Sequence, residues 1–130
     1  MPGASSARRP LSVKVTCAAD DAERSNQGLT VAATAVAAGA EVSLWLTGEA
    51  AWLGTRDALA GRPAVYALEH GVPPDDLVAT VLAMGRVTVC TQCAARRGIG
   101  ETDVLAGVRI AGSAVWVEEV LGEGVQALVY

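Results

Sequence analysis

The chain has 130 residues, of which 52% are hydrophobic and 18% charged, and its formal net charge is −4. Its length is close to the commonest size of one domain, and its hydrophobic content excludes an intrinsically disordered chain. The acidic balance and the lack of clustered lysine and arginine argue against a nucleic-acid-binding surface, because phosphate neutralisation needs such clusters. No stretch approaches the roughly 18 apolar residues of a membrane span.

The first ten residues precede the first hydrophobic segment and contain no apolar run of the kind that a secretory signal requires. We therefore expect residues 1–10 to form a disordered tail, residues 11–130 to form one domain, and the protein to be cytoplasmic. The odd number of cysteines, which are Cys17, Cys90 and Cys93, favours reduced thiols over a disulfide scaffold.

The first half of the chain predicts a strand, a helix and a second strand. Residues 11–17 alternate apolar and polar side chains and indicate the first strand. A helix is expected over residues 21–38, with Asp20 in a capping box at its start. Residues 41–46 indicate the second strand, which makes a βαβ unit with parallel strands. Residues 47–72 are expected to form a loop with one or two short helices.

The second half alternates helices and strands. In chain order it predicts a helix over 73–85, a strand over 86–90, a short helix over 91–97, a helical turn over 102–107, an extended piece over 108–110, a helix over 113–121 and a strand over 125–130. In the 113–121 helix we expect Ser113 as the cap and Ala114, Val117 and Leu121 to face inward. The whole order predicts a three-layer α/β/α sandwich around a mainly parallel sheet of four to five strands.

Cys90 is the residue with the clearest chemical potential, because it closes one predicted strand and opens the next predicted helix. Ligands of parallel sheets bind beyond the carboxyl ends of the strands. A thiol at the start of a helix faces unpaired N–H groups, which favour the nucleophilic thiolate. Cys17 closes the first predicted strand and is expected along the same edge, and residues 47–62 are a candidate for the wall of a cleft there.

Several interpretations of the cysteines remain open at this point. All three could be small apolar core residues. Cys90 and Cys93 have the C-x-x-C spacing of a thiol redox pair. A zinc site could combine the three cysteines with His70, the only histidine. Finally, Cys90 could carry sulfur as a persulfide, which uses the same displacement chemistry as thiol–disulfide exchange.

One segment resembles a known family. Val87-Thr88-Val89-Cys90, followed after five residues by Arg96-Arg97-Gly98-Ile99, is similar to the sulfur-carrier segment of the DsrE/TusD (DsrE/DsrF-like) family. The alanine-rich helix, the segment 39–42 and the segment 105–110 fit the same layout, so that the resemblance covers about residues 11–130. It implies a three-layer α/β/α fold, assembly into homo- or hetero-oligomers, and a persulfide carried on Cys90 between a sulfur donor and an acceptor protein.

The candidate catalytic residues are Cys90, which matches the carrier position of the family, and Cys93, which the C-x-x-C spacing adds and which departs from the simplest carrier pattern. Cys93 could resolve a Cys90 persulfide into a disulfide, or share a redox or metal role. The candidate supporting residues are Cys17, Thr91, Gln92 and Arg97. No cofactor is expected. The rival function is a non-catalytic assembly module of the same fold, with Trp45 in the core and Trp52 and Trp116 as candidate interface residues.

Overall fold

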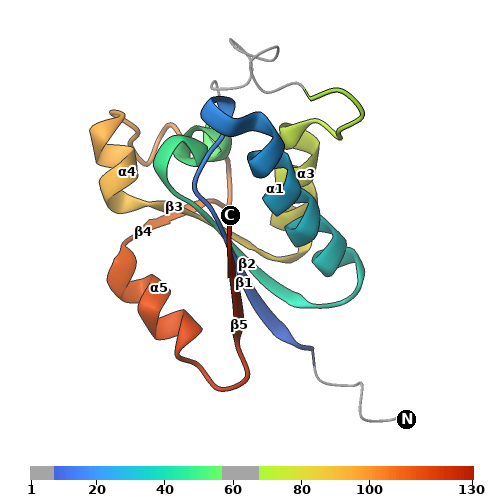
Figure 1. Cartoon of the computed structure of the whole chain (residues 1–130). Coiled ribbons are helices and arrows are strands. Elements are labelled where there is room, and N and C mark those ends of the chain that lie inside the picture. The colour runs from blue at the N-terminus through green and yellow to red at the C-terminus, as the bar shows by residue number, and fades with distance from the viewer. Residues whose placement is uncertain (1–7, 57–67) are drawn as a thin grey trace, which may run out of the picture.

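The computed structural model describes residues 8–56 and 68–130. Its centre is a five-stranded parallel sheet with the strand order β4-β3-β2-β1-β5 (Figure 1). The strands are β1 (Pro10–Val15), β2 (Glu41–Leu46), β3 (Arg86–Cys90), β4 (Arg109–Ala111) and β5 (Gln126–Val129). The helices are α1 (Ala22–Ala37), α3 (Pro74–Met84), α4 (Thr91–Arg96) and α5 (Ser113–Val120), with 3-10 helices η2 (Ala19–Asp21) and η3 (Gly48–Gly54). The α/β architecture predicted from the sequence is confirmed.

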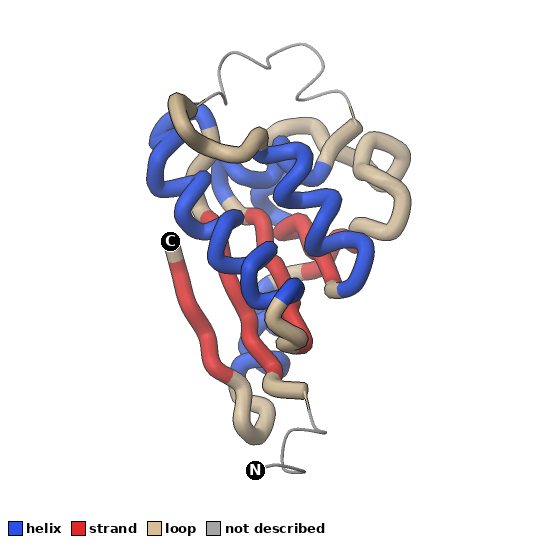
Figure 2. The backbone as a smooth tube through the Cα atoms, turned by 90° about the vertical axis from the view of Figure 1, so that its right-hand side faces the viewer, coloured by secondary structure: helices blue, strands red, loops and turns tan. Residues whose placement is uncertain are grey.

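Helices α1 and α3 cover one face of the sheet and lie side by side across it (Figure 2). The aliphatic core lies between these helices and the sheet, and it includes Val13, Leu29, Leu44, Val78 and Val87. Helix α1 approaches the sheet closely: a Cβ atom on its buried Gly28 would lie 2.8 Å from a methyl carbon of Val15. This close approach of α1 to the sheet therefore depends on the lack of a side chain at Gly28.

Helix α5 lies on the opposite face of the sheet (Figure 1) because the chain changes direction after β4. Strands β1 to β4 are added successively toward one edge, and β5 then pairs with β1 at the other edge. The crossover through α5 therefore runs backwards over the sheet. With right-handed crossovers, this reversal places α5 on the face that α1 and α3 leave uncovered.

The face under α5 carries polar and aromatic side chains instead of aliphatic ones. Glu119 of α5 accepts hydrogen bonds from the Ser43 hydroxyl at 2.7 Å and from Trp45 Nε1 at 3.3 Å, and it forms an ion pair with Arg109. The Trp45 ring packs edge-on against Trp116 at 5.6 Å between centroids. These contacts from β2, β4 and α5 join the second helical layer to the sheet.

Ionised Glu119 stabilises this layer in a pH-dependent way. Burial raises the pKa of Glu119, but the hydrogen bonds from Ser43, Trp45 and Arg109 and the charge of Arg109 outweigh burial and lower it. A carboxyl whose pKa is lowered by folding stabilises the fold above its unfolded pKa of about 4.3, and this contribution is lost as the pH falls through the folded pKa.

We expect the free energy of urea unfolding to fall less between neutral and acidic pH for Glu119→Gln than for the unaltered protein. Glu118→Gln, at the exposed neighbouring position, is the control, and equal acid sensitivity in all three proteins would contradict this role.

Most predicted elements occur within one or two residues of their expected bounds, and β2 and β3 match them fully. Strand β1 is shifted, since it begins at Pro10 and ends at Val15, so that Cys17 follows the strand instead of closing it. The capping residue of α1 is Asp21, whose carboxylate accepts the Arg24 N–H at 3.2 Å. Asp20 instead accepts the Ala18 N–H at 2.8 Å.

Two predictions in the last third of the chain are wrong. Residues 102–107 form no helix, because Val104 pairs with Thr55 in an antiparallel bridge. Helix α5 has Gly112 as its N-cap with no side-chain cap, and Ala114, Val117 and Leu121 are exposed, not buried. The polar contacts of Glu119 and the edge-on packing of Trp116 against Trp45 turn the other side of this helix toward the sheet.

Part of the segment 47–72 lies outside the described residues, as do residues 1–7 of the expected tail. Within the ranges 8–56 and 68–130, no helix is long and apolar enough to cross a membrane.

Candidate functional site

Cys90 lies at the junction of β3 and α4, where it is the last strand residue and the N-cap of the helix. Helix α4 adds Cys93 and Ala94 to the core on the α1 and α3 side of the sheet. The connection after the neighbouring strand β4 is α5, on the other side (Figure 1). The two connections therefore leave the carboxyl ends of the neighbouring strands β3 and β4 toward opposite faces of the sheet. Open α/β sheets bind their ligands at such a point.

The pKa of the Cys90 thiol lies below the ordinary value for a cysteine. Burial alone would raise it, since only 9% of the residue is exposed. Hydrogen bonds from the Cys93 N–H, the Cys93 side chain and the Gln92 N–H, together with the charge of Lys14, outweigh the effect of burial. A lowered pKa increases the fraction of Cys90 that is the nucleophilic thiolate at neutral pH.

The charge of Lys14 is one of the causes of the lowered Cys90 pKa, and this role was not predicted from the sequence. It is the only lysine of the chain and lies in strand β1, between β2 and β5. Its ammonium group is 4.3 Å from the ring centre of Trp116, which fixes the side chain on the α5 side of the sheet. Lys14 is half-buried between Val13 and Val15, which are both fully buried, and no local sequence pattern links it to Cys90.

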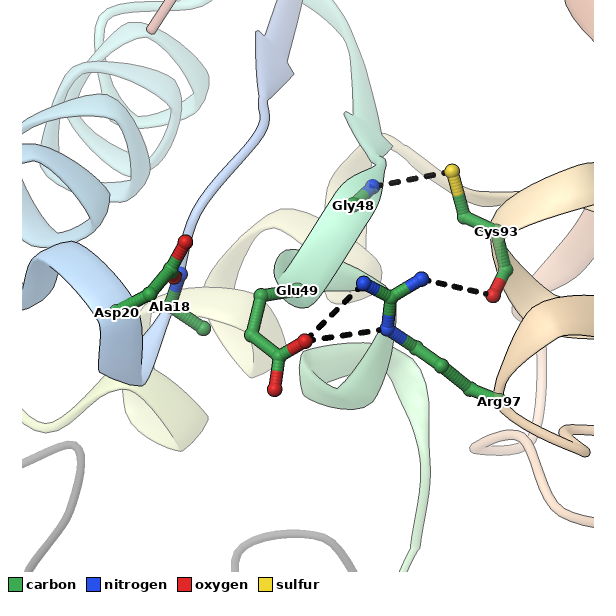
Figure 3. A network of polar contacts seen from close by, with 6 residues as sticks. All are labelled: Ala18, Asp20, Gly48, Glu49, Cys93 and Arg97. Carbon is green, nitrogen blue, oxygen red and sulfur yellow. Dashed lines mark hydrogen bonds and ion pairs between the residues drawn. The ribbon is translucent and has the colours of Figure 1, made fainter.

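Cys93 is held on the other side of the site by the start of η3 (Figure 3). The Gly48 N–H donates a hydrogen bond to Cys93 Sγ at 3.1 Å. Gly48 has a φ of +55°, and a Cβ atom there would lie 2.6 Å from the Thr16 carbonyl oxygen. Only glycine fits this position without strain, so the contact with the sulfur depends on it.

Arg97 fixes the position of α4 relative to η3. It forms an ion pair with Glu49 at 3.1 Å and donates a hydrogen bond to the Cys93 carbonyl at 3.1 Å (Figure 3). Its guanidinium is therefore occupied by groups of the chain itself, and it positions the helix that carries Cys93. Glu49, like Gly48, was not predicted, since nothing in the local sequence pairs it with a residue 48 positions later.

The other predicted site residues take different places. Cys17 is 4% exposed, and its pKa is raised by burial first and then by the charges of Asp20 and Asp21, against a lowering effect of Arg24. It therefore stays a thiol and is a poor nucleophile. The side chains of Thr91 and Gln92 are exposed next to Cys90, and the Gln92 contribution comes from its backbone N–H.

The cysteines do not assemble into a metal-binding set. Among residues 8–56 and 68–130, no three His, Cys, Asp or Glu side chains lie close enough together to hold a metal ion. These ranges include Cys17, Cys90, Cys93 and His70, so the structure shows no set of ligands for the zinc site that was considered from the sequence. The arrangement around Cys90 is that of an activated thiol next to a second thiol.

Comparison with known proteins agrees with the fold. The family model of the DsrE/DsrF-like family matches residues 13–124. The crystal structure of the ychN protein from E. coli has a TM-score of 0.76 at 18% identity, covering 94% of this chain and 99% of that one. MTH1491 from Methanobacterium thermoautotrophicum, a protein of unknown function, has a TM-score of 0.67 at 14% identity, covering 95% and 100%. Among curated proteins no match is found. The family match over most of the chain and the shared fold establish that this chain belongs to the DsrE/DsrF-like family.

Proposed function

We propose that this protein is a sulfur carrier that accepts sulfur on Cys90 as a persulfide and passes it to an acceptor protein. The observation that carries the proposal is the lowered pKa of Cys90 at the carboxyl end of β3, produced by the Gln92 and Cys93 N–H groups and the Lys14 charge. Family membership supports it, since residues 13–124 include the whole of the β3–α4 segment.

The chemistry needs only the groups around Cys90. The thiolate attacks a terminal sulfur of a donor such as polysulfide, and the shortened polysulfide leaves with the electron pair of the broken S–S bond. The outer sulfur of the resulting persulfide is anionic, so the same N–H groups and ammonium charge stabilise it. An acceptor thiolate then attacks that outer sulfur and releases Cys90 as a thiolate. This exchange requires a reducing compartment, and we place it in the cytoplasm.

Intact-mass spectrometry after exposure to polysulfide tests the proposal. The reduced protein is incubated with polysulfide, freed of excess donor and weighed with and without prior alkylation. We expect a gain of whole sulfur atoms on the unblocked protein and no gain after alkylation. A protein that alkylates slowly at all three cysteines and takes up no sulfur would contradict the carrier function and leave the non-catalytic assembly module as the better account.

We also propose that the chain assembles with copies of itself through α5 and β5. Four large apolar side chains in these two elements are exposed: Val117 (47%), Leu121 (79%), Leu128 (40%) and Val129 (63%). Strand β5 is also an edge strand of the sheet, and a free edge with apolar side chains favours pairing with another chain. A second copy is the occupant that matches both features, because the same strand edge is then available on each partner.

The oligomer is tested by the molar mass in solution. We expect Leu121→Asp to reduce the mass measured by light scattering after size-exclusion chromatography, because a charge would be buried in the interface. Glu123→Gln changes an exposed charge near the same end of α5 and is the matched control. A monomeric unaltered protein, or an unchanged mass for Leu121→Asp, would contradict this interface.

A further inference from the structure

The two thiols of the C-x-x-C segment are in direct contact. Cys90 has extended backbone angles (φ −65°, ψ 130°) as the N-cap of α4, and Cys93 lies in the first turn of that helix. The Cys93 side chain hydrogen-bonds to the Cys90 sulfur, and both residues are buried, with 9% and 8% exposure. A disulfide joins Cβ atoms that are about 3.5–4.5 Å apart, and the hydrogen bond between the two side chains places Cys93 next to the sulfur with which it would form one.

The position of Cys93 is fixed independently of Cys90. The Gly48 N–H points at Cys93 Sγ from η3, and the Arg97–Glu49 ion pair ties η3 to α4 on the far side of the same residue (Figure 3). A hydrogen-bond donor directed at a sulfur stabilises the negative charge that develops on it during exchange. A cysteine with a purely apolar packing role needs no such donor. The structure therefore presents Cys93 as a second reacting group.

We propose that Cys93 discharges the Cys90 persulfide and thereby limits the lifetime of the loaded protein; this inference rests on the proposed carrier function. The sulfur of Cys93 attacks the inner sulfur, Cys90 Sγ, and forms a Cys90–Cys93 disulfide. The bond between Cys90 Sγ and the outer sulfur breaks, and the outer sulfur leaves with the electron pair and the Cys93 proton as hydrosulfide. Cys93 Sγ is oxidised, Cys90 Sγ keeps the oxidation state that it has in the persulfide, and the outer sulfur is reduced, so no further oxidant is needed.

The two possible attacks on a persulfide are separated in space. Cys93 touches Cys90 itself and so has access to the inner sulfur, whereas an acceptor protein reaches the outer sulfur from the exposed side that carries Thr91 and Gln92. Fast transfer to an acceptor regenerates the free thiol. Without an acceptor, the protein closes into a disulfide that cannot be reloaded until a thiol reductant or hydrosulfide opens it.

The test follows the fate of loaded sulfur in the absence of an acceptor. The unaltered protein, Cys93→Ser and Cys93→Ala are loaded with polysulfide, freed of donor and kept without oxygen, and both intact mass and released hydrosulfide are measured over time. Cys17→Ser serves as the control that retains both reacting thiols. We expect the unaltered protein and Cys17→Ser to lose the added sulfur, to lose two hydrogens as the disulfide closes, and to release one hydrosulfide per loaded chain. Both Cys93 variants should keep the sulfur and release none.

The outcomes separate the two proposals. If the Cys93 variants take up sulfur and the unaltered protein keeps its sulfur equally long, the discharge step is wrong and the carrier function stands. If the disulfide joins Cys17 to another cysteine, the discharge step is also wrong. If no protein takes up sulfur, both proposals fail.

Discussion

Replacement of Cys90 by serine is expected to abolish sulfur uptake from polysulfide. A serine hydroxyl stays protonated at neutral pH, so the hydrogen bonds from Gln92 and Cys93 and the charge of Lys14 have no thiolate to stabilise. Serine is close to cysteine in size, and the site is at the end of β3, so the fold should be retained. The expected result in intact-mass spectrometry is a complete loss of the added sulfur.

Cys17→Ser is the matched control for this experiment. Cys17 is also buried beyond the carboxyl end of a parallel strand, but burial and the neighbouring Asp20 and Asp21 raise its pKa. The Cys17→Ser protein should therefore take up as much sulfur as the unaltered protein. Uptake that survives in Cys90→Ser and disappears in Cys17→Ser would show that the wrong thiol has been identified.

Replacement of Trp45 by alanine is expected to lower the free energy of unfolding by roughly 3–5 kcal/mol. Trp45 is 1% exposed in β2, it packs edge-on against Trp116, and the Arg109 guanidinium lies 5.5 Å from its ring centre. Its loss would leave a cavity under α5 and remove a hydrogen bond to Glu119. Since small domains are stable by about 5–15 kcal/mol, a large fraction of the total would be lost. Urea unfolding followed by circular dichroism measures the change.

Trp45→Phe separates packing from hydrogen bonding at this position. Phenylalanine retains most of the buried ring and loses the indole N–H that binds Glu119. We expect it to be clearly more stable than Trp45→Ala. Equal losses for both variants would assign the stabilisation to the hydrogen bond, and a loss under about 1 kcal/mol for alanine would mean that Trp45 does not anchor α5.

The position of Cys90 could be predicted because the local sequence determines it. Residues 86–90 alternate with valines at 87 and 89, and β3 occupies these same five residues. The chain then enters α4 directly, and this order alone places a thiol at a carboxyl end of the sheet. Trp45 was likewise correctly expected in the core, as an apolar residue within a strand.

The groups that surround Cys90 and Cys93 could not be predicted, because tertiary structure brings them together. Lys14 comes from a strand two places away in the sheet, and the Gly48 N–H comes from a 3-10 helix 45 residues before Cys93. Lys14 contributes a charge and Gly48 contributes a backbone N–H that is directed at the Cys93 sulfur. Neither contribution leaves a periodic pattern in the sequence.

The orientation of α5 was predicted wrongly for a related reason. This helix has apolar residues on more than one side, so hydrophobic periodicity alone selected Ala114, Val117 and Leu121 as its buried face. The hydrogen bonds of Glu119 to Ser43 and Trp45 decide the orientation instead. A charged residue at a helix–sheet contact is not expected from sequence patterns, and only its partners across the sheet explain it.

The most direct test of the carrier function is whether the sulfur bound to Cys90 is a transferable outer persulfide sulfur. Cyanide removes such a sulfur as thiocyanate and returns the cysteine as a thiolate. The loaded Cys93→Ser protein, in which Cys90 remains the reacting thiol, is treated with cyanide, and thiocyanate and intact mass are measured together. The carrier function predicts one thiocyanate for each sulfur gained and full recovery of the unloaded mass. Sulfur that stays on the protein, or mass that returns without thiocyanate, would contradict it.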